Sequence, residues 1–266
     1  MFKVFFKSTW FYLSVVVVLT IPLCLNLLGD HLIHGHDALA GLVRAVCMER
    51  YWGDGQFLIR WSPDVNFGYG SPIFSFYPPF FYYATLLISK ITHNTNLALN
   101  LTCAIFWILS GIGMYFFVRE FWGNKGAFLS AILYVYSPYY VQDFYVRGAF
   151  SEFSAFMIFP FLLLSIYKIN QKVQIRYIFL GVISAFISVL THGMGVFFII
   201  VAVFYALFLF FLNTGILENF FISKASLAKI LLVLVEISRE YILFAFTIIS
   251  STFFVLRSII LSIILV

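Results

Sequence analysis

Long apolar runs separated by short polar stretches make up most of this chain. A helix of about 20 residues crosses the ~30 Å hydrocarbon core of a bilayer, and runs of that order recur along the sequence. Backbone groups in lipid have to be paired within their own segment, so the runs predict an all-α, polytopic integral membrane protein. The predicted spans are Trp10–Leu28, Leu97–Val118, Ala127–Val141, Ala149–Tyr167, Tyr177–Leu190 and Val196–Leu212.

The rest of the chain divides into two parts. Residues 29–96 are predicted to be a long external loop, and residues 213–266 a cytoplasmic loop followed by further apolar segments. With those segments we expect a single membrane domain over residues 1–266, a helix bundle (residues 97–212) at its centre, and about seven or eight membrane segments. The sequence stops within an apolar run, so we expect a truncated product or one half of a split pair whose partner chain supplies the missing spans.

Composition excludes an ordinary soluble domain. Apolar residues make up 63% of the chain and charged residues 10%, whereas about half of a soluble protein is apolar. The net charge of +5 comes from basic residues placed singly at the ends of apolar runs. This is the pattern of membrane-protein loops, and it does not indicate binding to nucleic acid.

The distribution of basic residues predicts the orientation of the chain. If Phe74–Ser89 is an interfacial or re-entrant segment and does not cross, the basic loops Arg119–Lys125 and Lys168–Arg176 both fall on the cytoplasmic side, as does the N-terminus. The same choice places Asp37, the segment Tyr145–Glu152 and His192 together on the outer face.

Asp37 is the leading candidate for a catalytic residue. It follows the first span and precedes Ala38–Tyr51, which we expect to be an amphipathic helix at the membrane interface. Its spaced apolar residues are Leu39, Leu42, Val43 and Val46. The alternative role for Asp37 is the N-cap of that helix, which Asp favours. A cap and a catalytic carboxylate are compatible, because a cap fixes where the carboxylate points.

His31, His34 and His36 lie close to this aspartate. Their spacing matches no established zinc pattern, and histidines are common at a membrane–water boundary. No metal site is predicted from them, and the cofactor stays unknown.

A second set of candidates lies in the loop around Arg60, Trp61, Asp64 and Tyr69. The glycines and prolines there exclude a regular helix and predict a compact turn cluster. Either Asp64 bonds within its own turn, or the loop is a rigid rim whose arginine and aromatic rings surround a sugar. Spacing alone does not decide between the two.

Charged residues at the head of a span form a third set. Tyr145, Arg147 and Glu152 lie at the head of the span Ala149–Tyr167. The charges of Arg147 and Glu152 at that depth indicate a functional site by default. Arginine binds phosphate in forked geometry, but an ion pair of Arg147 with Glu152 or Asp143 explains the residues equally well. His192, between two later spans, is a candidate of the same kind, although a lone histidine is more often structural.

Several of these residues also carry a family resemblance. The run HD…RW-x-PD-x-x-x-GYG-x-P-x-F-x-FYPP, then SPYY, YVRGAFSE and a later TH, resembles the bacterial and archaeal membrane proteins called 6-pyruvoyl-tetrahydropterin synthase-related. The pattern is also similar to the GT-C superfamily of membrane glycosyltransferases, which use polyprenyl-phosphate sugars. Members of that superfamily are usually longer than this chain.

The resemblance implies an inverting glycosyltransferase of a prokaryotic inner (plasma) membrane. Asp37 occupies the place of the acidic residue in the first external loop of GT-C enzymes. Its substrates would be a polyprenyl-phosphate-linked sugar and a cell-envelope acceptor. We assign the departing phosphate to Arg147, with Arg60 as a second candidate, and the sugar pocket to Trp61 and Tyr69.

Two alternatives remain. A transporter or flippase for a polar lipid would show charges in the middle of facing helices and internal repeat symmetry, neither of which the sequence displays between Leu97 and Leu212. An inactive remnant or subunit of a transferase would fit the short length.

Overall fold

The computed structural model describes residues 8–214. Residues up to Ala206 form one compact unit, and Leu207–Thr214 are the described part of a second. Within residues 8–214 the ordered elements are all helical, with no strand, as predicted. They are α2 (Thr9–Cys24), η1 (Leu25–Leu27), α3 (Ala38–Gly53), α4 (Ile73–Phe76), α5 (Phe80–Thr92), α6 (Thr95–Val135), α7 (Pro138–Gln142), η2 (Asp143–Arg147), α8 (Phe150–Gln171), α9 (Ile175–Thr191) and α10 (Gly193–Asn213).

Four helical stretches in the described part are long and apolar enough to cross a membrane: Thr9–Leu27, Thr95–Arg147, Phe150–Gln171 and Gly193–Asn213. The longest is broken at Gly123, whose φ of 64° and ψ of −169° are not helical. The two halves of α6 lie side by side, because Trp107 Nε1 donates a hydrogen bond of 2.9 Å to the Val135 carbonyl. This agrees with the two predicted spans at Leu97–Val118 and Ala127–Val141. The predicted total of seven or eight segments stays a prediction, since part of it falls in residues 215–266, outside the described residues.

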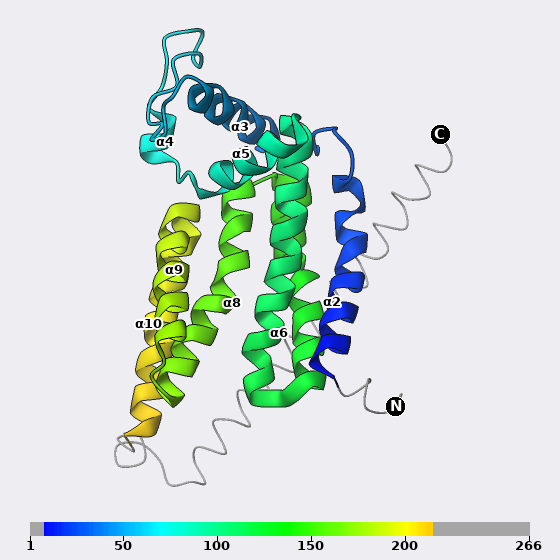
Figure 1. Cartoon of the computed structure of the whole chain (residues 1–266), viewed down its shortest axis with the longest axis vertical. Helices are drawn as coiled ribbons and strands as arrows, with labels where there is room; N and C mark the ends of the chain where they lie inside the picture. The colour runs from blue at the N-terminus through cyan, green and yellow to red at the C-terminus, as the bar shows by residue number, and fades with distance from the viewer. Residues whose placement is uncertain (1–7, 215–266) are drawn as a thin grey trace, which may run out of the picture. The chain divides into compact units, whose positions relative to one another are not determined.

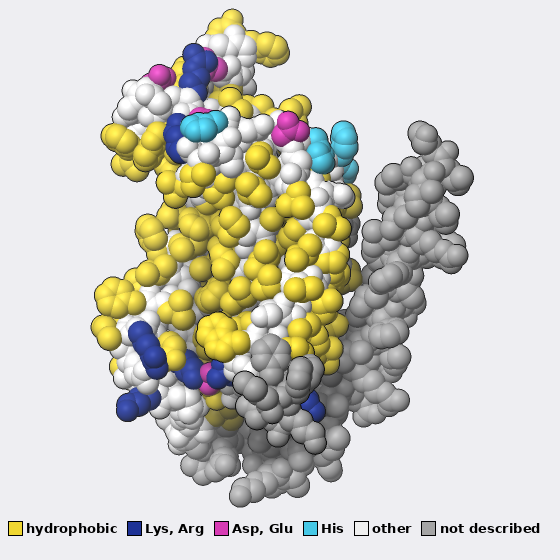
Figure 2. All heavy atoms as spheres, turned by 45° about the vertical axis from the view of Figure 1, so that its right-hand side comes forward, with side chains coloured by type: hydrophobic (Ala, Val, Ile, Leu, Met, Phe, Trp, Pro, Cys, Tyr) yellow, Lys and Arg dark blue, Asp and Glu magenta, His cyan; other side chains and the backbone are white. Residues whose placement is uncertain are grey.

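The helices pack into a bundle with a separate layer at one end. In the ribbon, α2, both halves of α6, α8 and α9 run along one another, while α3, α4 and α5 lie across the ends of the long helices (Figure 1). Apolar side chains cover the middle of the face seen in Figure 2, and most charged and histidine side chains gather toward its two ends. Such a surface fits a bilayer, whose hydrocarbon core solvates apolar side chains and excludes charge.

The loops group at the two ends of the bundle. At one end, Lys168 at the end of α8 forms an ion pair of 2.6 Å with Glu120, close to the break in α6. At the other end, the Asp37 N–H donates a hydrogen bond of 2.7 Å to the carbonyl of Arg147. The two basic loops therefore lie together, opposite Asp37. Which end faces the cytoplasm stays a prediction.

Side chains from later elements hold the end of α2. Pro22 lies inside this helix and has no N–H to donate. The Tyr136 hydroxyl donates a hydrogen bond of 2.6 Å to the Leu19 carbonyl, and the Tyr145 hydroxyl one of 2.5 Å to the Leu23 carbonyl. The hydroxyl of Tyr145 therefore faces α2, and its predicted role in substrate binding stays untested.

The segment predicted to be interfacial or re-entrant contains a short helix. The chain breaks at Tyr77–Pro79, after which α5 has 13 residues. At 1.5 Å per residue α5 rises only about 20 Å, less than the ~30 Å hydrocarbon core. That this segment does not cross the membrane stays a prediction.

Helix α3 forms where it was predicted, but its apolar face points away from the protein. Leu39, Val43 and Val46 are exposed, whereas its small side chains are buried. A Cβ on Gly41 would lie 2.5 Å from the ring of Phe150, so small residues allow α3 to approach α8 closely. The exposed aliphatic side chains are then free to contact lipid, as in an interfacial helix. The buried residues of α3 are Ala38, Gly41, Ala45, Cys47, Met48 and Tyr51.

Labelling single cysteines from each side of the membrane tests this grouping of loops. We expect cysteines at Asp54 and Gln142 to react from one side, and cysteines at Gln171 and Lys172 from the other. All four positions are exposed, and the three native cysteines are buried and can be replaced beforehand. Labelling of positions 54 and 142 from opposite sides would contradict the fold.

Candidate functional site

Two loops meet backbone to backbone at the end of the bundle that carries Asp37. Beyond the Asp37–Arg147 hydrogen bond, the His36 N–H donates one of 3.2 Å to the Val146 carbonyl. Glycines permit this approach: a Cβ on Gly35 would lie 2.9 Å from the backbone nitrogen of Gly148. Gly148 has a φ of 68°, which L side chains rarely adopt. The contact fixes Asp37 beside the head of α8.

Gly148→Ala should therefore destabilise the protein and disturb this contact. A Cβ there would lie 2.9 Å from both the nitrogen and the Cβ of Ala38, and the left-handed backbone adds strain of about 1–2 kcal/mol. We expect a lower thermal midpoint in detergent. The control is Gly53→Ala on α3, where nothing lies within 4 Å of an added Cβ. Equal midpoints for the two variants would contradict the close approach.

A short π-helical segment places the charged residues. In η2, Arg147 Nη1 forms an ion pair of 2.7 Å with Asp143 Oδ1, four residues earlier. The Asp143 side chain is fully buried, while the Arg147 side chain is 40% exposed. Short π-helical turns inside helices are frequent at functional sites. Here the turn brings a buried carboxylate under an arginine that still reaches the surface.

Arg147 also binds the second carboxylate named from the sequence. Its Nη2 lies 2.9 Å from Glu152 Oε2. The Tyr139 hydroxyl donates a hydrogen bond of 2.5 Å to Glu152 Oε1 and lies 3.3 Å from Arg147 Nη1. Both ion pairs considered from the sequence are thus formed at once. The single positive charge of Arg147 therefore faces two buried carboxylates.

His192 lies close to this cluster. Burial lowers the pKa of His192 below its ordinary value; the Glu152 carboxylate opposes this shift and Arg147 adds to it. The ring is therefore neutral at pH 7, and its Nδ1 accepts a hydrogen bond of 3.3 Å from the Met194 N–H. Asp37, Arg147, Glu152 and His192, which the sequence analysis expected on one face, lie at one end of the bundle in the structure.

Asp37 occupies the N-cap position of α3, but its side chain forms no capping hydrogen bond. The residue is exposed, and no ion pair is found for its carboxylate among residues 8–214. The capping hydrogen bond that would explain Asp37 as a structural residue is therefore not formed in this structure. The carboxylate is available to an incoming group.

Arg44 is a site residue that sequence analysis did not single out. Its guanidinium carbon lies 3.9 Å from the centre of the Tyr77 ring, and its Nη1 donates to the Tyr82 hydroxyl at 3.4 Å. Tyr77 in turn lies 6.5 Å from the His192 ring. The signal in the sequence was spacing, because Arg44 comes seven residues after Asp37 and so falls on the same side of a helix.

The candidates in the polar loop follow the C-terminal end of α3, away from Asp37. Asp64 binds Arg50 at 2.7 Å and the Tyr51 hydroxyl at 2.8 Å, rather than its own turn alone. Trp61 is placed by Gly70, where a Cβ would lie 2.7 Å from its ring. This loop follows the end of α3 remote from Asp37, and a 16-residue helix is about 24 Å long. No described contact joins Asp37 to the candidates in this loop, which are Arg60, Trp61, Asp64 and Tyr69.

The histidines near Asp37 do not form a metal-binding group. Among residues 8–214, no three His, Cys, Asp or Glu side chains are placed to share a metal ion.

The fold and the site define a helical membrane protein with a polar cluster at one end of its bundle. Residues 74–233 match the model of the 6-pyruvoyl-tetrahydropterin synthase related domain, described as a membrane protein. The match covers more than half of the chain, which therefore belongs to this family. It includes Arg147, Glu152 and His192 but begins after Asp37. Searches of curated proteins and of solved structures give no match.

Proposed function

We propose that this protein is a membrane glycosyltransferase of the GT-C type. It transfers a sugar from a polyprenyl-phosphate donor to a cell-envelope acceptor at the outer face of a prokaryotic plasma membrane. The observation that carries the proposal is the exposed carboxylate of Asp37, which makes no capping hydrogen bond to α3. It stands next to a cluster of charged residues at the end of an apolar bundle, where a lipid-linked donor and a water-soluble or lipid acceptor can meet.

The proposed reaction is a single displacement. The Asp37 carboxylate takes the proton of an acceptor hydroxyl as general base. The acceptor oxygen then bonds to the anomeric carbon of the sugar, while the bond from that carbon to the phosphate oxygen breaks. The electron pair leaves with the polyprenyl phosphate, and the configuration at the anomeric carbon is inverted.

The charged cluster supports this step electrostatically. We assign Arg147 to the departing phosphate, because its side chain is partly exposed and donates up to five N–H groups. Glu152 and Asp143 position its guanidinium. A neutral His192 adds no positive charge in this arrangement. Arg60, Trp61 and Tyr69 would contact the sugar or acceptor only through movement of the polar loop toward Asp37.

A flippase is the second candidate, and one observation weighs against it. In α8 the charged residues Glu152 and Lys168 occupy the first and last turns of the helix. In α9 the single charged residue, Arg176, is in the first turn. A polar lipid crossing between these helices would meet an apolar path, whereas transporters place charged or polar groups near the midplane.

Transfer can be measured in membranes that contain the full chain. A polyprenyl-phosphate sugar labelled in the sugar is supplied, and incorporation into the envelope fraction is compared with membranes lacking the protein. We expect label to move to an acceptor. Movement of intact labelled donor between leaflets, without transfer, would favour the flippase and contradict the proposal.

A further inference from the structure

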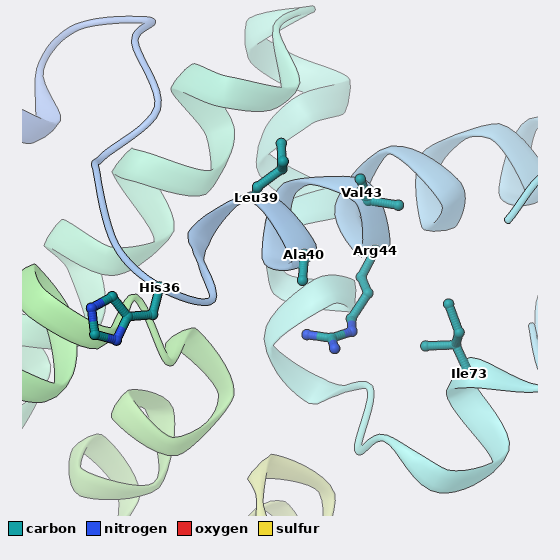
Figure 3. A pocket seen from close by; sticks show the side chains of 6 residues that line it. All are labelled: His36, Leu39, Ala40, Val43, Arg44 and Ile73. Atoms are coloured by element: carbon teal, nitrogen blue, oxygen red, sulfur yellow. The ribbon is translucent and has the colours of Figure 1, made fainter. Parts of the chain in front are cut away.

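An open, shallow hollow lies at the start of α3, beside Asp37. Its volume is about 430 Å³, and the residues that line it are His36, Leu39, Ala40, Val43, Arg44 and Ile73. Figure 3 shows the Arg44 guanidinium extending from α3 into the space between this helix and the segment that carries Ile73, while His36 lies just before the helix begins. Leu39 and Val43 project from the opposite edge of α3.

Arg44 carries a positive charge that no carboxylate balances. Among residues 8–214, Arg44 and Arg147 are the two arginines that are partly buried, and the others are exposed. Arg147 has two carboxylate partners, whereas no carboxylate oxygen in the described part lies within 4.0 Å of Arg44. A partly buried charge without a counter-ion is unfavourable. The hollow is therefore a place where an anion would stabilise the protein.

The groups around Arg44 favour a phosphate. A guanidinium held on the Tyr77 ring keeps N–H groups in its plane free for a forked contact with phosphate oxygens. His36 also lines the hollow, and its imidazole carries a ring N–H donor.

The remaining walls indicate that the phosphate carries a lipid. Leu39, 65% exposed, and Val43, 42% exposed, line the same hollow from the other edge of α3, so the hollow extends from the Arg44 guanidinium to aliphatic surface. A free phosphate ion gains nothing from such a border, whereas the first carbons of a hydrocarbon chain do. We infer that this hollow binds the phosphate of a lipid, with Arg44 and His36 on the phosphate and Leu39, Val43 and Ile73 on the chain.

This inference deepens the proposed function, because it places the phosphate of the donor next to Asp37. His36 lines the hollow and Asp37 follows it in the chain, so the sugar on such a phosphate would start beside the proposed base. The two arginines then have distinct roles. Arg44, which has no carboxylate partner in the described part, attracts the phosphate of the donor, and Arg147, held by Asp143 and Glu152, contacts that phosphate as it departs.

Binding of farnesyl phosphate to the purified full-length protein in detergent tests the inference without any sugar. Titration calorimetry should give a dissociation constant that rises at least tenfold in Arg44→Gln and recovers in part in Arg44→Lys. The control is Arg176→Gln, because Arg176 also stacks on a tyrosine, at 4.7 Å from the Tyr177 ring, but is exposed at the start of α9. We expect unchanged affinity in this control. Thermal midpoints of all variants report whether they are folded.

The other ligands separate the sources of the signal. Farnesol and inorganic phosphate, each alone, should bind at least tenfold more weakly than farnesyl phosphate. Equal binding of inorganic phosphate would overturn the lipid part of the inference, and equal binding of farnesol would overturn the phosphate part. Folded Arg44→Gln with wild-type affinity would overturn the site itself.

The result does not depend on transfer activity. Failure of the transfer assay together with Arg44-dependent binding would leave the lipid-phosphate site standing and remove the glycosyltransferase. Normal transfer by Arg44→Gln, despite lost binding, would show that this site is not the donor site.

Discussion

Replacing Asp37 by Asn should abolish most sugar transfer while leaving the protein folded and inserted. Asn has nearly the same shape but cannot accept the acceptor's proton, and a general base typically contributes about 10²- to 10⁴-fold to the rate. The carboxylate makes no capping hydrogen bond in the structure, so its loss should not lower the thermal midpoint. Farnesyl phosphate should still bind. Initial transfer rates and thermal midpoints, measured on the same preparation, check both statements.

The matched control is Asp54→Asn. Asp54 is also exposed and follows the last residue of α3, at the other end of the helix from Asp37. The same chemical change there should leave transfer at the wild-type rate. Normal transfer by Asp37→Asn would exclude the carboxylate as the base. A drop in thermal midpoint would instead point to a structural role for this residue.

Arg147→Ala should be the most destabilising single change in the site. It leaves two carboxylates without their cation, and their side chains are 0% exposed in Asp143 and 5% exposed in Glu152. Breaking a buried ion pair from one side typically costs 3–5 kcal/mol. Because the arginine itself is 40% exposed, we expect about 3 kcal/mol, at the lower end of that range. Unfolding of the purified protein in mild detergent measures the loss.

A triple variant separates lost charge balance from lost packing. Combining Arg147→Ala with Asp143→Asn and Glu152→Gln removes the stranded charges while keeping the shapes of the acidic side chains. This variant should recover most of the lost stability and still fail in transfer, because the proposed phosphate contact is gone. Stability of Arg147→Ala equal to that of wild type would show that the ion pairs contribute nothing net. Unchanged affinity for the donor would remove Arg147 from the binding site.

The sequence predicted an all-helical membrane protein, but it did not indicate which face of each helix packs against the other helices. Charge placement predicted both basic loops on the cytoplasmic side; the Lys168–Glu120 ion pair brings the end of α8 close to the break in α6, and the side of the membrane stays a prediction. In α3 the spaced aliphatic residues predicted an interfacial helix, and they are exposed in the structure. Lipid is as apolar as a protein core, so hydrophobicity does not distinguish the side that meets lipid from the side that meets another helix. Small residues such as Gly41 marked the packed face instead.

Prediction of the site from the sequence was limited in a similar way. Asp37 and Arg147 could be assigned to the same end of the bundle from the sequence, but their contact depends on two glycines far apart in the chain, Gly35 and Gly148. Arg44 was passed over because its type and spacing look like those of any interfacial arginine. What distinguishes it is the lack of a carboxylate partner in the described structure, and this property depends on residues brought close only by folding.

The hydroxyl contacts that hold α2 also bear on how the protein is assembled. Synthesis begins at the N-terminus, so α2 reaches the bilayer well before its partners exist: 117 residues separate Leu19 from Tyr136, and 122 separate Leu23 from Tyr145. Leu23 lies in the last turn of α2, where carbonyls have no partner within the helix. Pro22 weakens the same stretch, because it has no N–H for the carbonyl of Val18, next to Leu19. Backbone groups without partners are costly in lipid. The newly inserted first helix is thus incomplete until the second half of α6 and η2 have followed it. Membrane insertion and tertiary folding are therefore coupled here, because α2 obtains these two hydrogen bonds only when Tyr136 and Tyr145 have been inserted beside it.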